Sequence, residues 1–186
     1  MEQIYDYWFT ISRLYRTDRG KTIFICDTSV IEYPDAKQLA DMAKSAARVV
    51  RLFGFDPKVA FLSHSTFGKP LSRNTRHVRD AIEKLKKEKV DFDFDGEMQP
   101  DVALNPVYRE IYPFSKIVGS ANVLIMPSLL AANISFKLLQ KLGGGSILGP
   151  LMIGGEKPFQ IVQMGSSVSD IVNSASIATY NAVFSK

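Results

Sequence analysis

Hydrophobic and polar residues follow two different periods along this chain, and the change of period marks its expected elements. Residues 58–65 and 122–127 are short apolar runs bounded by polar or turn-forming residues, which is typical of buried strands. Between Asp35 and Phe53, apolar residues recur at steps of three and four. This spacing predicts an amphipathic helix that ends at Gly54.

The other patterns extend this alternation of strands and helices. Two strand-like runs, 8–16 and 21–27, are joined by the turn-forming sequence TDRG and predict an N-terminal β-hairpin. Strands that alternate with helices require crossover connections, so we expect an α/β fold in three layers, with a largely parallel sheet covered by helices on both faces. The remaining predicted elements are helices at 72–89, 131–144 and 168–184, and strands at 90–97, 146–153 and 159–164.

Composition and charge are typical of a soluble globular domain, with 46% hydrophobic residues, 23% charged residues and a net charge of +4. The basic residues of 73–89 alternate with acids and lack interleaved aromatics, so they predict a solvated helix face and no nucleic-acid partner. The longest apolar stretch, 122–136, is interrupted by Pro127 and is too short to span a bilayer. We therefore expect no membrane partner.

Cys26 is the single cysteine, which excludes an internal disulfide and favours a reducing compartment. It lies in a run of strand-forming residues, so we expect a buried, inert thiol. The N-terminal sequence MEQIYDYWF lacks the basic region of a secretory signal. Together these features predict a cytoplasmic location.

Two stretches partly match known ligand-binding motifs, a calcium loop and a phosphate-binding loop, but each lacks a required residue. Asp91, Asp93 and Asp95 match the first three ligands of a calcium loop, but Val102 stands where an EF-hand needs its bidentate acid. The glycine run after residue 142 lacks the Lys-Ser/Thr of a phosphate-binding loop and is better explained as the end of a helix. We expect no metal and no nucleotide cofactor in this chain.

The sequence SHSTFG follows a predicted strand, at the edge where open α/β sheets bind ligands. Ser63, Ser65, Thr66 and Gly68 could donate hydrogen bonds to a polar ligand, or they could form a turn capped by serines. His64 would point to the opposite side of the strand from Ser63, which argues against a catalytic serine–histidine pair.

Near the C-terminus, Ser167 and Asp170 have the spacing of a capping box, in which each side chain accepts from the other residue's backbone N–H. The preceding Gly165 permits a sharp turn, and the N-terminus of the predicted helix would favour an anion. A structural and a catalytic role for Asp170 are equally supported at this point.

Six longer stretches carry motifs specific enough to compare with known families: CDTSVIEYPDAKQLADMA, LFGFDPKVAFLSHSTFGKP, DFDGEMQPDVALN, YPFSKIVGSANVLIMPSLLAANISFKLLQKLGG, ILGPLMIGGEKP and GSSVSDIVNSASIA. On these stretches, residues 22–182 resemble the phosphate acetyltransferase/butyryltransferase family. The resemblance is greatest to the version of this family fused to the C-terminus of bacterial NADP-dependent malic enzymes.

The resemblance implies a fold of two α/β lobes, each like a lobe of isocitrate/isopropylmalate dehydrogenase, with a cleft between them. In that fold the second lobe is an insertion, after which the chain returns to finish the first. Residues 1–148 would then be the second lobe, with 1–20 as lead-in and hairpin strand. Residues 149–186 would be the returning strand–helix segment of an otherwise absent first lobe.

The resemblance also implies site residues. The general base of the family falls on Asp170, and the Ser-Arg pair that stabilises the reacting groups falls on Gln163 and Met164. A further family arginine falls on Lys141, and Gly165 and Ser166 lie in the implied ligand-binding turn. A methionine thioether cannot donate a hydrogen bond, and losing one such electrostatic stabiliser typically costs roughly 10²–10³ in rate.

The resemblance therefore implies an acyl-CoA-binding regulatory and oligomerisation region of an NADP-dependent, oxaloacetate-decarboxylating malic enzyme, without efficient acetyltransferase activity. Acetyl-CoA or CoA would be the ligand, the chain would form at least a homodimer, and NADP and a divalent metal would bind only in an upstream domain. One alternative is an active phosphate acetyltransferase in which Lys141 or Lys69 replaces the missing arginine. Another is a purely structural oligomerisation domain.

Overall fold

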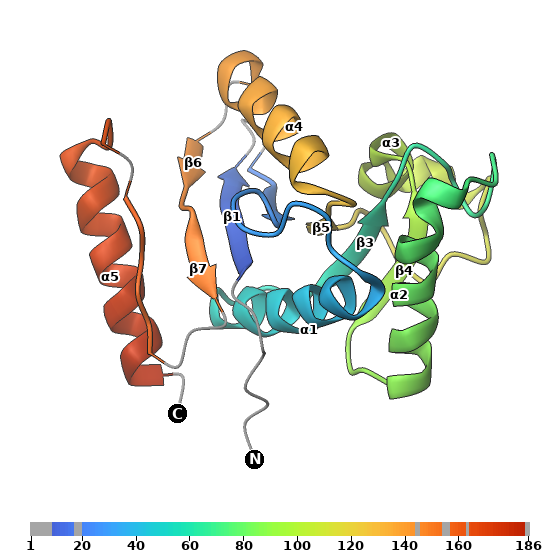
Figure 1. Cartoon of the computed structure of the whole chain (residues 1–186), viewed down its shortest axis with the longest axis horizontal. Coiled ribbons are helices and arrows are strands. Elements are labelled where there is room, and N and C mark those ends of the chain that lie inside the picture. The colour runs from blue at the N-terminus through green and yellow to red at the C-terminus, as the bar shows by residue number, and fades with distance from the viewer. Residues whose placement is uncertain (1–8, 17–19, 144–145, 154–156, 163, 185–186) are drawn as a thin grey trace.

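The computed structural model describes residues 9–16, 20–143, 146–153, 157–162 and 164–184. Seven strands form one sheet in the order β4-β3-β5-β2-β1-β6, and β7 also pairs with β1 (Figure 1). The strands are β1 Phe9–Arg16, β2 Thr22–Cys26, β3 Lys58–Leu62, β4 Asp93–Met98, β5 Val123–Ile125, β6 Ser146–Leu148 and β7 Leu151–Ile153.

The sheet is parallel in its central part and antiparallel at one side. Strands β2, β5, β3 and β4 pair in parallel, whereas β1 runs antiparallel to β2 and also to β6 and β7. The predicted largely parallel sheet is thus confirmed for the four strands that crossovers connect. The turn expected between β1 and β2 falls on residues 17–19, outside the described residues, so the hairpin itself stays a prediction.

Helices cover both faces of the sheet, which confirms the three-layer α/β fold. Alternate strand residues such as Phe24 and Phe61 pack against α1 and α2, while Ile25 and Leu62 pack on the other face against α3 and α4. The period of two along the strands thus separates two cores. The helices are α1 Ala36–Leu52, α2 Arg76–Glu88, α3 Pro100–Leu104, α4 Leu129–Leu142 and α5 Val168–Phe184, with 3₁₀ turns at Arg73–Thr75 and Pro106–Arg109.

The predicted strand at 159–164 is wrong for its described residues. Residues 159–162 have no regular secondary structure, and Ile161 and Val162 are 52% and 45% exposed. A strand needs a neighbour to satisfy its backbone groups, and Met152 N of β7 donates to the side-chain Oε1 of Gln160 at 3.0 Å, not to a backbone carbonyl of this segment. The predicted strand at 146–153 is divided into β6 and β7 at Gly149, where φ is +114°.

Local capping interactions set the helix ends, and some of these ends differ from the predicted boundaries. The α1 start matches its prediction because Gln38 N donates to Asp35 Oδ1 at 2.8 Å and Asp35 N donates to Gln38 Oε1 at 2.9 Å. By contrast, α4 begins two residues before the predicted 131, since Ser128 caps it through Ala131 N at 3.3 Å. The described helices include none long and apolar enough to cross a membrane.

Cys26 lies in the core with 0% exposure, which confirms its predicted burial. Desolvation, together with the neighbouring Asp27, raises the pKa of the thiol well above its ordinary value. The folded chain therefore keeps the thiol proton at a pH where the unfolded chain releases it. The contribution of the protonated thiol to the free energy of unfolding is complete below the pKa of the unfolded chain. As pH rises above about 8.5, this free energy falls by up to about 1.4 kcal/mol per pH unit.

We expect Cys26→Ala to flatten this decline in the free energy of unfolding between about pH 8.5 and 10. Urea unfolding of both proteins across that range measures the slope of the free energy of unfolding against pH. The loss of packing around the smaller alanine side chain lowers this free energy equally at every pH and leaves the slope unchanged. Equal slopes would show that the thiol ionises as easily in the fold as in the unfolded chain.

Candidate functional site

The carboxyl ends of the parallel strands form the edge of the sheet at which a ligand site is expected. The chain leaves β3 toward α2 on one face and leaves β5, the neighbouring strand, toward α4 on the other face. Adjacent strands whose connections diverge in this way leave a crevice at their carboxyl ends. The predicted SHSTFG site follows β3 at this place.

Residues 66–69 of this loop make a tight turn. Thr66 N donates to the Lys69 carbonyl at 3.0 Å, and Lys69 N donates to the Thr66 carbonyl at 3.1 Å. Both central residues have positive φ, +48° at Phe67 and +82° at Gly68, as in type I′ turns. Gly68 adopts this conformation at little cost, whereas Phe67 is a non-glycine residue held there by its surroundings.

The hydroxyl groups of the loop point into the protein. Ser63, Ser65 and Thr66 are 7%, 0% and 8% exposed, while His64 between them is exposed. The Ser63 and Ser65 Oγ atoms lie 3.1 Å apart, and Thr66 Oγ1 accepts from Gln99 N at 3.2 Å. The prediction that His64 and Ser63 point to opposite sides is confirmed, because Ser63 is buried and His64 is exposed. The geometry supports the turn interpretation of these hydroxyls, and their contact with a ligand stays a prediction.

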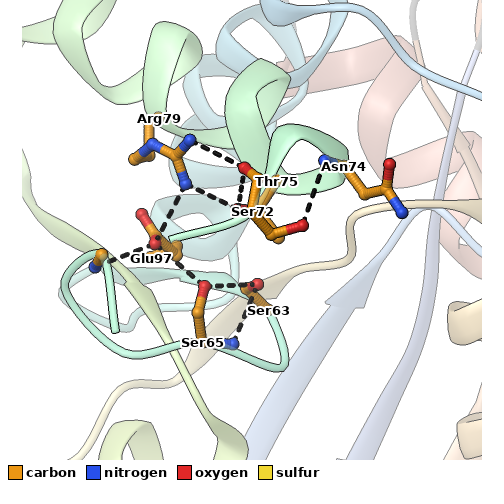
Figure 2. A network of polar contacts seen from close by, with 8 residues as sticks. Ser63, Ser65, Ser72, Asn74, Thr75, Arg79 and Glu97 are labelled. Carbon is orange, nitrogen blue, oxygen red and sulfur yellow. Dashed lines mark hydrogen bonds and ion pairs between the residues drawn. The ribbon is translucent and has the colours of Figure 1, made fainter. Parts of the chain in front are cut away.

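A buried carboxylate organises the loop (Figure 2). Glu97, at the end of β4, is 1% exposed, and its Oε1 accepts from Ser65 Oγ at 2.9 Å and from Gly68 N at 3.0 Å. Arg79 Nη1 lies 3.4 Å from the same oxygen. Since Glu97 contacts the residue before the turn and a central residue of the turn, it fixes the loop against β4.

Arg79 connects this carboxylate to the start of α2. Its Nη1 donates to Thr75 Oγ1 at 2.6 Å, and its Nη2 donates to the Ser72 carbonyl at 2.9 Å (Figure 2). Loop 63–69, β4 and the first turn of α2 thereby share one polar network. We define the side chains of Ser65, Arg79 and Glu97 as the loop clamp.

The loop clamp was not predicted from the sequence. The basic residues of 73–89 predict a solvated helix face, which is correct for most of that helix but wrong for Arg79, whose side chain is 26% exposed. The signal was present, because Arg79 directly borders the buried stripe of Val78 and Ile82. Asp95, from the calcium-like stretch, accepts instead from Lys116 N at 2.8 Å.

The second group of predicted residues lies at the start of α5. Met164 is fully exposed, and Gly165 precedes the helix in a turn. Ser167 N and Oγ donate to Asp170 Oδ2 at 2.9 and 2.8 Å, and Asp170 N donates to Ser167 Oγ at 3.2 Å. The predicted capping box is thus confirmed. Gln163 lies outside the described residues.

The structure does not bring the two predicted groups together. Helix α5 stands at one end of the molecule, beyond β7, whereas β3 and the loop that follows it lie toward the other end (Figure 1). Ser166 is half-buried in the turn before α5, and Lys141 is exposed in the last turn of α4. Within the described part of the chain, loop 63–69 and the start of α5 form separate surfaces.

Helix α5 presents apolar side chains to solvent. Val168, Val172 and Val183 are 78%, 57% and 57% exposed, although Ile177 packs against the core. A shallow groove along the helix is lined by Val172, Ala175, Ser176, Thr179, Tyr180 and Val183. An exposed apolar helix face of this kind is typical of a surface that packs against a further domain or a partner protein.

A family profile and individual relatives all match this chain to the same family of proteins. The family profile "Phosphate acetyl/butaryl transferase" matches residues 9–179. The chain is 47% identical over 164 residues to the NADP-dependent malic enzyme of Rhizobium meliloti (strain 1021), covering 88% of this chain and 22% of that protein. It is 43% identical over 163 residues to the phosphate acetyltransferase of Treponema pallidum (strain Nichols), covering 86% of this chain and 48% of that protein.

A solved structure gives the same answer for the fold. The phosphotransacetylase from Streptococcus pyogenes superposes with a TM-score of 0.91 at 31% identity, covering 98% of this chain and 56% of that chain. The chain therefore spans about half the length of phosphate acetyltransferases and about a fifth of the malic enzyme.

Proposed function

The chain belongs to the phosphate acetyl/butaryl transferase family, and from this premise we propose that it is the acyl-CoA-binding, regulatory and oligomerisation region of an NADP-dependent malic enzyme. It binds acetyl-CoA or CoA without efficient acetyl transfer. NADP and a divalent metal act in a separate upstream domain of the same protein, which decarboxylates malate.

The observation that carries this proposal is the chemistry of the turn before α5. On the resemblance to the family, Met164 falls on the position of an arginine, and its exposed thioether can neither donate a hydrogen bond nor offset negative charge. Asp170 is retained, but its Oδ2 already accepts two hydrogen bonds from Ser167. A turn of this kind can still accommodate an anion at the helix N-terminus, yet it lacks the electrostatic stabilisation that acyl transfer requires.

The exposed apolar face of α5 supports the proposed division of the chain into two parts. In the proposal, residues 1–148 form the second lobe and residues 149–186 complete a first lobe whose other elements cover α5. Its exposed Val168, Val172 and Val183 then lie in the interior of that lobe. The acyl-CoA site lies in the cleft between the lobes, which places loop 63–69 and the start of α5 on separate walls.

Regulation follows if acetyl-CoA binds one state of the assembled enzyme better than another. A ligand shifts such an equilibrium only by its difference in affinity for the two states. Loop 63–69 suits this task because the loop clamp ties it to α2 and β4, so a ligand that moves the loop also moves those elements.

The second candidate is an active phosphate acetyltransferase that transfers acetyl between acetyl phosphate and CoA. The 43% identity to the enzyme of Treponema pallidum favours it. A lysine would then replace the arginine at 164. Lys69 belongs to the loop at the far end from α5, so Lys141, at the end of α4, is the better candidate.

Calorimetric titration of acetyl-CoA into the parent protein tests the proposal. We expect saturable binding, together with acetyl phosphate turnover at least about 100-fold below that of a family member with the arginine. Asp170→Ala should retain most of the binding affinity, because this carboxylate caps the helix and does not activate a thiol.

Restoring the family pair gives the matched control. Gln163→Ser combined with Met164→Arg should raise acetyl phosphate turnover while leaving acetyl-CoA binding in place. Efficient turnover by the unaltered protein would instead favour the second candidate. If millimolar acetyl-CoA gave no heat of binding, the ligand-binding proposal would be wrong, and only a structural role would remain.

A further inference from the structure

Three aromatic side chains form a cluster beside loop 63–69, at the β4 end of the sheet. The ring centroid of Phe67 lies 4.8 Å from that of Phe114 and 5.3 Å from that of Tyr112, and the centroids of Tyr112 and Phe114 are 6.0 Å apart. We call these three residues the aromatic cluster. Strand β4 lies at the opposite end of the molecule from α5, so the cluster is separate from the turn before that helix (Figure 1).

Packing within the described part of the chain explains only part of the aromatic cluster. Phe67 and Tyr112 are half-buried, whereas Phe114 is 65% exposed. Phe67 has a φ of +48° at a turn position where asparagine or glycine costs less, and its N donates to the Glu97 carbonyl at 2.7 Å, which fixes the backbone there. A costly backbone position that presents one ring to another, exposed ring favours a role for these rings in binding.

The charge beside the aromatic cluster is not balanced. Residues 63–79 include four lysines and arginines and no aspartate or glutamate. Arg76 and Arg79 pair with acids at 3.6 and 3.4 Å, whereas Lys69 and Arg73 are exposed and form no ion pair with any acid among the described residues. Two cations without a neutralising acid attract an anionic ligand.

A phosphorylated purine matches both features. Purine rings stack on aromatic side chains, and phosphate oxygens accept charge-assisted hydrogen bonds from lysine and arginine. Lys69 closes the turn two residues after Phe67, and Arg73 begins the 3₁₀ turn four residues later, so both cations belong to the same connection as the ring. An apolar peptide would contact the rings but would give the two cations no partner.

We propose that the aromatic cluster, together with Lys69 and Arg73, binds a purine nucleotide. The base stacks on Phe67 and Phe114, and the phosphates contact the two cations. A free nucleotide and the adenosine 3′,5′-bisphosphate end of CoA offer the same chemistry, and the titrations below distinguish these two sources. Only the second source rests on the proposed function.

Calorimetric titration of adenosine 3′,5′-bisphosphate, and separately of ATP, into the full chain tests the site. At least one of them should saturate below about 1 mM, and Phe114→Ala should weaken its binding roughly 10-fold through the loss of stacking. Phe114 is exposed, so the circular dichroism of this variant should be unchanged. Tyr33→Ala is the matched control, since Tyr33 is 74% exposed and follows β2, which β5 separates from β3. No saturation of either nucleotide by about 5 mM, or equal weakening by the two alanine variants, would overturn the proposal.

A pair of charge variants tests the phosphate contacts without changing the rings. Lys69→Gln/Arg73→Gln should weaken nucleotide binding roughly 10-fold at low salt, and this difference should shrink as salt concentration rises. Lys86→Gln/Lys87→Gln removes the same charge from the last turn of α2 and should change the affinity little. Equal weakening by the two double variants would show a response to net charge alone and would contradict the site.

Acetyl-CoA and acetyl-4′-phosphopantetheine, which lacks the nucleotide end, identify the source of the nucleotide. When the site takes the nucleotide end of CoA, Phe114→Ala weakens acetyl-CoA binding and leaves the binding of acetyl-4′-phosphopantetheine unchanged. When the site takes a free nucleotide, the same variant weakens ATP binding and leaves acetyl-CoA binding unchanged. Nucleotide binding without any acetyl-CoA binding would refute the proposed function and leave this site in place. Acetyl-CoA binding without any effect of Phe114→Ala on either ligand would refute this site alone.

Discussion

Replacing Gly96 by valine should destabilise the folded chain by about 3 kcal/mol, more than most single substitutions. Gly96 faces Phe61 in the parallel pair of β4 and β3. A Cβ atom at this position would lie 2.7 Å from the Phe61 carbonyl oxygen, 3.0 Å from Phe61 Cβ and 3.3 Å from Ile82 Cδ1. In addition, its φ of +146° is a conformation that side-chain-bearing residues rarely adopt.

The matched control is Gly68→Ala, where φ is +82° but no atom lies within 4 Å of an added Cβ. This variant carries backbone strain alone, and we expect a cost of about 1 kcal/mol. Urea unfolding of Gly96→Val, Gly96→Ala and Gly68→Ala separates steric contact from backbone strain. If Gly96→Ala cost no more than Gly68→Ala, the close approach of β3 to Gly96 would be wrong.

Removing the carboxylate of the loop clamp should have an effect of similar size. In Glu97→Ala, Ser65 Oγ and Gly68 N lose their acceptor in a site that is almost fully buried. An unsatisfied buried donor costs about 1–3 kcal/mol, so we expect a loss of roughly 3 kcal/mol in the free energy of unfolding. Arg79 contributes less to this loss, because it is partly exposed and keeps its bonds to Thr75 and Ser72.

Two controls make the Glu97 prediction specific. Glu97→Gln keeps an oxygen that can accept from Ser65 and Gly68, so its cost should be well below that of alanine. Glu83→Ala removes an exposed carboxylate paired with Lys86 and should change stability little. Equal losses for Glu97→Gln and Glu97→Ala would show that charge, and not the hydrogen-bond acceptor, holds the loop.

The Glu97 variants also examine whether loop 63–69 takes part in ligand binding. If the loop is one wall of the acyl-CoA site, Glu97→Gln should weaken acetyl-CoA binding by more than its small effect on stability implies. Unchanged affinity would confine the loop to a structural role and would shift the proposed site toward α5 and the end of α4.

Local sequence determined most of the elements. Helix α1 could be placed to within a residue because its apolar period and the Asp35–Gln38 capping box lie within the helix itself. The capping box at Ser167 and Asp170 and the burial of Cys26 were likewise predictable. In each case the interaction joins residues a few positions apart, or depends on the hydrophobicity of one short run.

The tertiary structure alone decided which polar and apolar groups are covered. Glu97 meets Ser65 and Arg79 across 32 and 18 residues of sequence, and no local pattern specifies such partners. The run at 159–162 pairs with no strand in the described part of the chain, and Leu130, Leu138 and Leu142 of α4 are exposed although they are large apolar residues. Pairing and burial depend on which distant elements meet, so they become visible only when the chain is folded.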